Sequence, residues 1–336
     1  MDFQLPIQIK TLPQGISYHD KMMLMGSCFT EHIGEILQTM KFDVMQNPHG
    51  ILFDPASVAH SLLSYLKPKT YGPEDLFFMN ELWQSWHHHS SFSSTDRDAV
   101  CERIHQAQLS AHSFLKQAKW LIVTLGTSFS YRFSDQIPTE MKQGSSGDVA
   151  NCHRAPGGWF VKHLMTIEEI NAALDTCIHQ LFQFNTEIQV IFTVSPVRHI
   201  RDGIVENNRS KARLIETVHY LVNKFDRIHY FPSYELVIDI LRDYRFYDID
   251  LVHPNYAATE YVLEKFSQHC IDKSSQMIMQ EVRRIVIARK HKAFQPNTKA
   301  HQRFLKEHFE KTKLLKSQYP FLNLDEELDY FSVSGK

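Results

Sequence analysis

Short apolar runs that alternate with helix-like segments constrain the fold of this chain more than any other feature. Residues 21–26, 120–125 and 188–194 have the pattern of buried strands. Between them, apolar residues recur at helical spacing, as in the stretches 95–119 and 166–184. Parallel strands need a crossover between them, and that crossover is usually a helix. The sequence therefore predicts an α/β protein with a parallel sheet and helices on both faces.

Composition and charge are those of an ordinary globular protein. Hydrophobic residues make up 43% of the chain and charged residues 22%, with a formal net charge of −2. This charge gives no general reason to expect nucleic acid or an anionic membrane as a partner. No apolar run approaches the roughly 20 residues that span a bilayer. The five cysteines are scattered, and the first residues lack the pattern of a secretory signal. We therefore expect a cytoplasmic protein with no disulfide framework, metal or cofactor.

A helical extension follows the alternating region. We expect the α/β domain to cover residues 1–272 and the extension to cover residues 273–336. Residues 281–316 contain eleven Lys or Arg against three Glu. A surface for nucleic acid or an acidic partner is one interpretation. Aromatic residues are sparse there, so a solvated helical face is favoured.

Glycine-rich and polar segments follow the predicted strands, where ligand chemistry occurs in parallel sheets. Ser27 comes at the end of the first strand and beside a helix N-terminus, where backbone N–H groups can hold an oxyanion. Cys28 is an alternative nucleophile, but it should point to the opposite side of the chain. A serine needs a base, and the base needs an orienting carboxylate. Asp250 and His253 can turn toward each other, and Pro254 fits the first position of the next helix.

Two long excursions interrupt the alternation, at residues 67–94 and 134–162. The first contains His87, His88 and His89. Three adjacent histidines cannot all face one metal, so we interpret this stretch as a solvated or aromatic-packed loop. The sequence leaves open whether the excursions form a lid.

Several motifs occur in order between about residues 20 and 270 and resemble a known family. They are Gly26-Ser27-Cys28-Phe29, Asn47-Pro48-His49-Gly50, Thr124-Leu125-Gly126-Thr127, Asn151-Cys152-His153, Ser195-Pro196-Val197-Arg198-His199, Glu206-Asn207-Asn208-Arg209-Ser210-Lys211 and Asp243-Tyr244-Arg245-Phe246-Tyr247. The first resembles the motif that names the GSCFA domain family, with Thr30 in place of the alanine. That family is similar to the SGNH/GDSL hydrolases, which are flavodoxin-like α/β/α sandwiches with a serine nucleophile and a late Asp-x-x-His.

The resemblance implies roles for particular residues. Ser27 would be the nucleophile, and its backbone N–H would contribute to the oxyanion hole. His253 would be the general base, and Asp250 would orient it. Gly50 would provide a second backbone N–H to the oxyanion.

The third oxyanion donor of SGNH enzymes is an asparagine after the third strand, and this chain departs from that pattern. Ser128 occupies the corresponding position. Either Ser128 donates, or Asn151 reaches in from the second excursion, or the oxyanion hole is weaker. The aspartate that usually precedes the serine is replaced by Gly26.

Three further residues could bind substrate. His153 and His199 could line the pocket or be hydrogen-bonded structural histidines. Arg198 could bind an anionic or sugar substrate, and its position after a strand favours the pocket for Arg198 and His199.

We expect a serine esterase-type hydrolase or acyltransferase. Its substrate would be a small-molecule or carbohydrate ester, with neither membrane nor nucleic acid as a partner. The acyl group, the acceptor and the oligomeric state stay open. One alternative is a binding protein that keeps the pocket without catalysis. A second is an interaction protein that uses the basic helical extension.

Overall fold

A five-stranded parallel sheet forms the centre of the computed structural model, which describes residues 5–145 and 147–333. The strand order is β10-β9-β5-β1-β2, and every neighbouring pair is parallel. Counted along the chain, these five strands follow the flavodoxin-like order 2-1-3-4-5. The strands are β1 (Met22–Gly26), β2 (Val44–Gln46), β5 (Trp120–Leu125), β9 (Gln189–Val194) and β10 (Ile228–Tyr230). The predicted α/β fold with a parallel sheet is confirmed.

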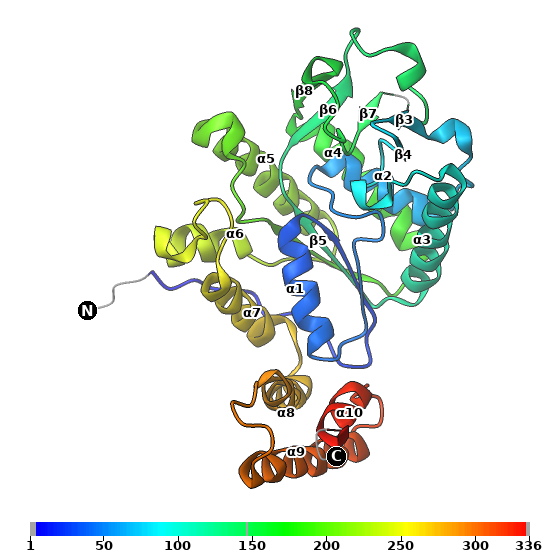
Figure 1. Cartoon of the computed structure of the whole chain (residues 1–336). Coiled ribbons are helices and arrows are strands. Elements are labelled where there is room, and N and C mark those ends of the chain that lie inside the picture. Colours follow the sequence, from blue (N-terminus) through cyan, green and yellow to red (C-terminus); the bar gives the residue numbers. More distant parts are fainter. Residues whose placement is uncertain (1–4, 146, 334–336) are drawn as a thin grey trace.

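Helices cover both faces of this sheet (Figure 1). Alternate residues of β1 enter different cores: Met22 and Leu24 face one, Met23 and Met25 the other. The first core includes side chains of α1 (Cys28–Thr39) and α7 (Tyr256–Cys270). The second includes side chains of α2 (Pro55–Leu66), α3 (Arg97–Gln117), α4 (Ile167–Phe184) and α5 (Gly203–Lys224). Both faces of the strands are therefore buried, which explains their continuous apolar runs.

The C-terminal helices lie at the end of the molecule opposite the two excursions (Figure 1). They are α8 (Lys273–Lys290), α9 (Lys299–Gln318) and α10 (Asp325–Val333). Val282, Leu305 and Leu324 belong to the same apolar core as α1 and α7. None of the helices in the described ranges is long and apolar enough to cross a membrane.

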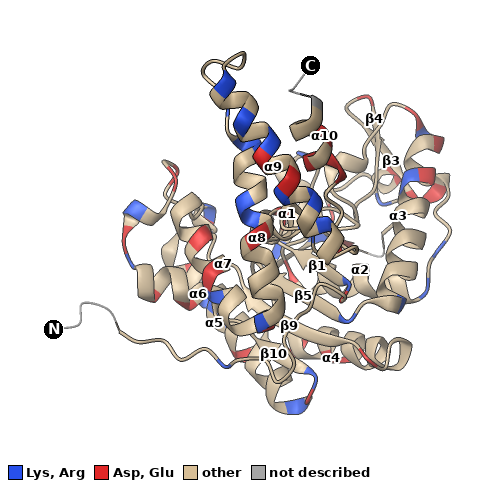
Figure 2. Ribbon diagram, turned by 90° about the horizontal axis from the view of Figure 1, so that it is seen from below, with Lys and Arg blue, Asp and Glu red and all other residues tan. Residues whose placement is uncertain are grey.

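Basic and acidic residues are interspersed along these helices (Figure 2). Lys41 and Arg289 flank the buried carboxylate of Glu327, at 2.9 and 3.3 Å. Three further basic residues of the extension pair with carboxylates: Arg283 with Glu260, Arg284 with Glu281 and Lys316 with Asp325. Part of the positive charge is therefore neutralised within the chain, which favours the interpretation as a solvated helical face.

The two excursions are more structured than a surface loop. The first contains the hairpin of β3 (Phe77–Met79) and β4 (Leu82–Gln84). The second, together with the residues that flank it, forms a three-stranded sheet of β7 (Asp148–Val149), β6 (Phe129–Phe133) and β8 (Phe160–Leu164). They share a small core in which Phe77 stacks on the fully buried Trp86 at 3.7 Å. The sequence did not reveal this packing because its contacts join residues far apart in the chain.

Gly26 ends β1 in a conformation that only glycine adopts easily. Its φ is +130°, and an added Cβ would lie 2.1 Å from the Thr124 carbonyl oxygen. We expect Gly26→Ala to lower the free energy of unfolding by about 3 kcal/mol or more, because backbone strain and a clash with β5 add together. Urea denaturation measures this loss.

Gly147→Ala is the matched control. Gly147 has a φ of +132° but nothing within 4 Å of an added Cβ. It carries the backbone strain alone, so we expect a loss of only about 1–3 kcal/mol. Equal losses in the two variants would contradict the close approach of β1 to β5.

Candidate active site at the carboxyl end of the sheet

Ser27 lies where β1 passes into α1, as its position in the sequence predicts. It is the N-cap of α1, and its backbone N–H donates to the Thr124 carbonyl at 3.1 Å. The residue is 1% exposed, and its Oγ is buried without a hydrogen-bond partner among the described residues. A buried hydroxyl that makes no hydrogen bond is unfavourable. The Ser27 hydroxyl therefore has hydrogen-bonding capacity that no described residue uses.

Asp250 and His253 form the expected pair in the loop before α7. His253 Nδ1 lies 2.6 Å from Asp250 Oδ2. The other carboxylate oxygen accepts the backbone N–H groups of Val252 and His253, at 2.9 and 3.0 Å. The hydrogen bond from the His253 ring and these two N–H groups lower the pKa of Asp250 to about 2. The imidazole is therefore held through Nδ1, and its Nε2 stays available for another partner.

No hydrogen bond joins Ser27 to His253 within the described part of the chain. The His253 side chain is 44% exposed, whereas Ser27 is closed to solvent. A segment that contains Leu52 and Phe53 crosses the ends of β1 and β5. The Leu52 N–H donates to the Gly26 carbonyl, and the Phe53 carbonyl accepts from the N–H groups of Gly126 and Thr127. A substrate can reach Ser27 only if a neighbouring segment moves.

Three of the expected oxyanion donors make other hydrogen bonds in this structure. Besides Ser27, Gly50 donates its N–H to the Asn47 carbonyl at 2.7 Å. Ser128 is buried; its N–H donates to Ser210 Oγ at 2.7 Å, and its Oγ donates to the Ser210 carbonyl at 3.2 Å. These contacts would have to break before Gly50 or Ser128 could hold an oxyanion.

Asn151 and His153 lie in the second excursion, beside the core that the two excursions share. Asn151 Oδ1 accepts the backbone N–H of His153 at 3.0 Å. The His153 ring contacts Phe77 and Trp86, and its Nε2 lies 2.8 Å from the Ser85 carbonyl. Of the two roles left open for His153, the structure shows the hydrogen-bonded one.

Arg198 and His199 lie beside the loop that carries His253. The Arg198 backbone N–H donates to the Val252 carbonyl at 3.3 Å. Its guanidinium lies over the rings of Tyr247 and Tyr244, at 4.4 and 5.1 Å. Arg198 also lines a cleft together with Tyr234, Tyr244 and residues of early α5. Burial, followed by the charge of Lys211, lowers the pKa of His199 to about 4.

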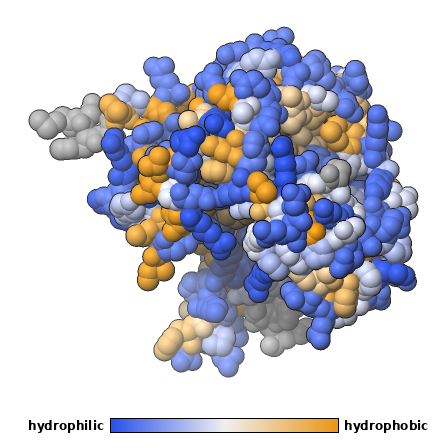
Figure 3. Space-filling model, turned by 90° about the horizontal axis from the view of Figure 1, so that it is seen from above, coloured by the Kyte–Doolittle hydropathy of each residue, from blue (hydrophilic) through white to orange (hydrophobic). Residues whose placement is uncertain are grey.

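Apolar side chains surround this cleft on the carboxyl-end face of the sheet. Figure 3 views that face, and hydrophobic residues gather on its left side, over the region of α5 to α7. Of the residues that line the cleft, Ile200, Ile204 and Tyr244 are exposed. Ile249 and Leu251, on the loop that carries His253, are exposed as well. An amphipathic ligand would find both an arginine and apolar contacts here.

Lys211 is a residue that the sequence analysis named only as part of a motif. It is 1% exposed, and its Nζ donates to the carbonyls of Gly126 and Ser195, at 2.6 Å each. Both of these partners are carbonyl oxygens, no carboxylate pairs with Lys211 within the described ranges, and burial lowers its pKa to about 7. The signal was present in the sequence, because Lys211 falls on the buried stripe of α5 with Asn207 and Leu214.

Buried histidines lie around the turn that contains Gly50. The rings of His49 and His88 are 4.1 Å apart, and those of His60 and His87 stack at 4.2 Å. His49 and His88 are fully buried. The residues that the structure describes contain no group of three ligands able to hold a metal ion. The aromatic-packed interpretation of this stretch therefore applies to His88, which contacts Tyr71 and Phe92.

The fold and the site together define an α/β/α protein with a serine and an Asp–His pair at the carboxyl ends of its strands. The chain belongs to the GSCFA family, whose model matches residues 21–266. A second model, described as the C-terminal domain of GSCFA domain proteins, matches residues 282–333. No curated protein matches the chain.

The buried histidines predict a loss of stability in mild acid. Burial lowers the pKa of His49 to about 3 and that of His87 to about 4. An unfolded histidine titrates near pH 6.5. The unfolded chain therefore binds more protons below about pH 6.5, and the free energy of unfolding falls as the pH drops toward 4. Urea denaturation between pH 7.5 and 5 measures this slope while most carboxylates stay ionised.

His49→Gln should make that slope shallower. His32→Gln is the control, because His32 is exposed on α1 and should leave the slope unchanged. Identical slopes in the wild type and His49→Gln would contradict the assignment.

We expect the charge of Lys211 to influence the pKa of the nearby His199. Lys211→Met removes the charge that helps to lower the pKa of His199, so that pKa should rise. An NMR titration of the His199 ring measures the change. Lys224→Met removes a charge from the exposed end of the same helix and should leave the pKa of His199 unchanged. An unchanged value in Lys211→Met would rule out the influence of Lys211 on the site.

Proposed function

We propose that the protein is a serine esterase-type hydrolase or acyltransferase that acts on an acyl ester. The observation that carries the proposal is the 2.6 Å hydrogen bond between His253 and Asp250, which leaves Nε2 of the imidazole available. It occurs in a loop at the strand-end face where Ser27, buried and unpaired, caps a helix. These are the parts of an SGNH-like serine mechanism.

The reaction follows from these roles. Ser27 Oγ attacks the ester carbonyl carbon, its proton passes to His253 Nε2, and the carbonyl electron pair moves to oxygen. When the carbonyl re-forms, the bond to the alcohol breaks and the alcohol leaves with the proton from His253. Water, or an acceptor hydroxyl in a transferase, then releases the acyl group by the same steps. Asp250 keeps the imidazole oriented and stabilises its positive charge.

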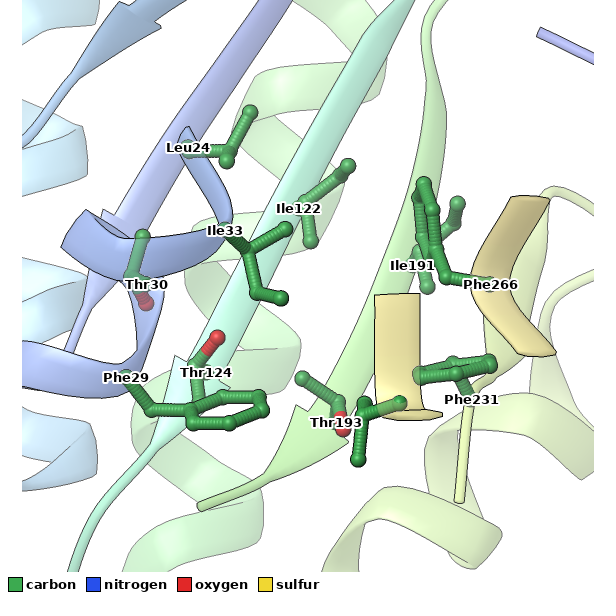
Figure 4. A pocket seen from close by; sticks show the side chains of 11 residues that line it. Leu24, Phe29, Thr30, Ile33, Ile122, Thr124, Ile191, Thr193, Phe231 and Phe266 are labelled. Atoms are coloured by element: carbon green, nitrogen blue, oxygen red, sulfur yellow. The ribbon is translucent and has the colours of Figure 1, made fainter. Parts of the chain in front are cut away.

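A small apolar cavity supports a short acyl group. It lies between the sheet and helices α1 and α7, and Phe29, Thr30 and Ile33 line it from α1 (Figure 4). Its volume is about 20 Å³, close to the space of one water-sized group. Because Phe29 and Thr30 follow Ser27 closely in the chain, the cavity could receive the methyl end of an acyl group.

A second candidate is a binding protein with the same pocket. One observation favours it: Ser27, Gly50 and Ser128 all use their backbone N–H groups in other hydrogen bonds. A protein with no free donor for an oxyanion would bind an acyl or sugar ligand without turning it over.

Purified protein should hydrolyse p-nitrophenyl acetate and react with a fluorophosphonate. Ser27→Ala should abolish both signals, and Asp250→Asn should lower the rate by at least about 10³-fold because the imidazole loses its orientation. The rates of ester hydrolysis and of labelling give the two measurements.

Cys28→Ala is the matched control at the adjacent position. It should keep full activity, because the Cys28 thiol is not the nucleophile. Burial also raises the pKa of this thiol, which disfavours the thiolate. Labelling that survives Ser27→Ala and disappears in Cys28→Ala would overturn the assignment of Ser27. An inert wild-type protein would favour the binding protein.

A further inference from the structure

Asn47 is hydrogen-bonded to Gly26, the residue that precedes the candidate nucleophile. It follows β2 directly, and its backbone N–H donates to the Leu24 carbonyl of β1 at 2.8 Å. Its side-chain Oδ1 accepts the backbone N–H of Gly26 at 2.9 Å. The Asn47 amide is therefore fixed beside the peptide that joins Met25 to Gly26, one residue before Ser27.

The other end of this amide has no partner. Asn47 Nδ2 is buried and makes no hydrogen bond within the described ranges. The orientation of the amide is set by chemistry, because the Gly26 N–H can only donate and so must face the oxygen. A buried, unpaired N–H₂ group costs about 1–3 kcal/mol, and such groups are rare in folded proteins. Ser27 Oγ, on the neighbouring strand end, is buried and unpaired in the same way.

We propose that Asn47 Nδ2 is the side-chain donor of the oxyanion hole. This inference rests on the proposed function and names a catalytic residue for it. When Ser27 attacks, the carbonyl electron pair moves to oxygen, and an N–H of Asn47 donates a hydrogen bond to that oxygen. No bond of Asn47 breaks, and the hydrogen bond weakens again when the carbonyl re-forms.

Asn47 fits this role better than the donors that the sequence suggested. Ser128 uses both its N–H and its Oγ in bonds to Ser210. Asn151 caps a turn within the excursions through its Oδ1. Asn47, in contrast, is hydrogen-bonded to Gly26, which directly precedes Ser27. Its N–H₂ group makes no hydrogen bond within the described ranges.

The backbone conformation of Asn47 tolerates aspartate, so a substitution can separate a structural role from a catalytic one. Its φ is +42°, a left-handed conformation that asparagine and aspartate tolerate better than most residues. Asn47→Asp keeps an oxygen for the Gly26 N–H and nearly the same shape, but it removes both N–H donors. A purely structural role of Asn47 would survive this change, whereas an oxyanion donor would not.

The test compares wild type and Asn47→Asp in p-nitrophenyl acetate hydrolysis, with thermal unfolding alongside. We expect kcat to fall by about 10²–10³-fold, as for the loss of one oxyanion donor, with KM little changed. The melting temperature should fall somewhat, because a carboxylate oxygen replaces a buried amide nitrogen, so kcat is compared at a temperature where both proteins are folded. Asn80→Asp is the control, because Asn80 also has a positive φ, +52°, but lies in the exposed turn between β3 and β4.

The outcomes separate this inference from the proposed function. An inert wild type would overturn the proposed function and this inference with it. An active wild type with an equally active Asn47→Asp would overturn the role of Asn47 alone. If Asn47→Asp does not fold, the test is an NMR measurement on the wild-type protein. A methyl trifluoromethyl ketone that adds to Ser27 should shift the side-chain NH₂ resonances of Asn47 downfield. Resonances that do not move would overturn the inference.

Discussion

The contact between Gly26 and the end of β5 determines most of the geometry around Ser27. The Thr124 carbonyl oxygen lies 2.1 Å from where a Cβ of residue 26 would be, and the same oxygen accepts the N–H of Ser27. Asn47 holds the N–H of Gly26 from the other neighbouring strand. The two peptides that flank Gly26 are thus fixed from opposite sides of β1, and α1 begins at a defined point. This contact also explains why glycine precedes the serine, because the aspartate implied by the SGNH resemblance would have no room.

Lys211 gives the strand ends an unusual electrostatic environment. Removing an ammonium group from water costs several kcal/mol, and two hydrogen bonds to carbonyl groups offset only part of that cost. A carboxylate partner would offset more, yet Lys211 has none within the described ranges. Because burial lowers the pKa of Lys211 to about 7, the amine carries its charge in only part of the molecules near neutral pH. In its charged form it would attract an anion that forms nearby, and that attraction is strong where water is excluded. A tetrahedral intermediate at Ser27 would be such an anion, so the position of Lys211 agrees with the proposed chemistry.

The sequence predicted the features that depend on local pattern and failed on those that depend on distant contacts. Apolar periodicity predicted the parallel sheet, and the spacing of Asp250 and His253 predicted their hydrogen bond, because both are local properties. The bonds of Ser128 to Ser210 were not predictable, since they join the end of β5 to α5 across 82 residues. For the histidines at positions 87–89 the sequence left a solvated and an aromatic-packed loop open, because the rings that cover His88, such as those of Tyr71 and Phe92, come from other parts of the chain.

The candidate site consists of a closed half and an open half, and this division bears on its substrate. Ser27 is buried, whereas the side chains of Asp250 and His253 are both about half exposed. An ion pair that is exposed to water contributes little free energy on its own. Excluding water would strengthen the hydrogen bond between Asp250 and His253, and with it the support that Asp250 gives to the His253 imidazole as a base. Ile249 and Leu251, on the same loop, are exposed and could be covered by a ligand. In the proposed reaction the small cavity lined by Phe29 and Thr30 would receive the acyl group, so the part of the ester that covers the loop would be the alcohol. The proposal therefore extends to esters that join a short acyl group to a bulky alcohol.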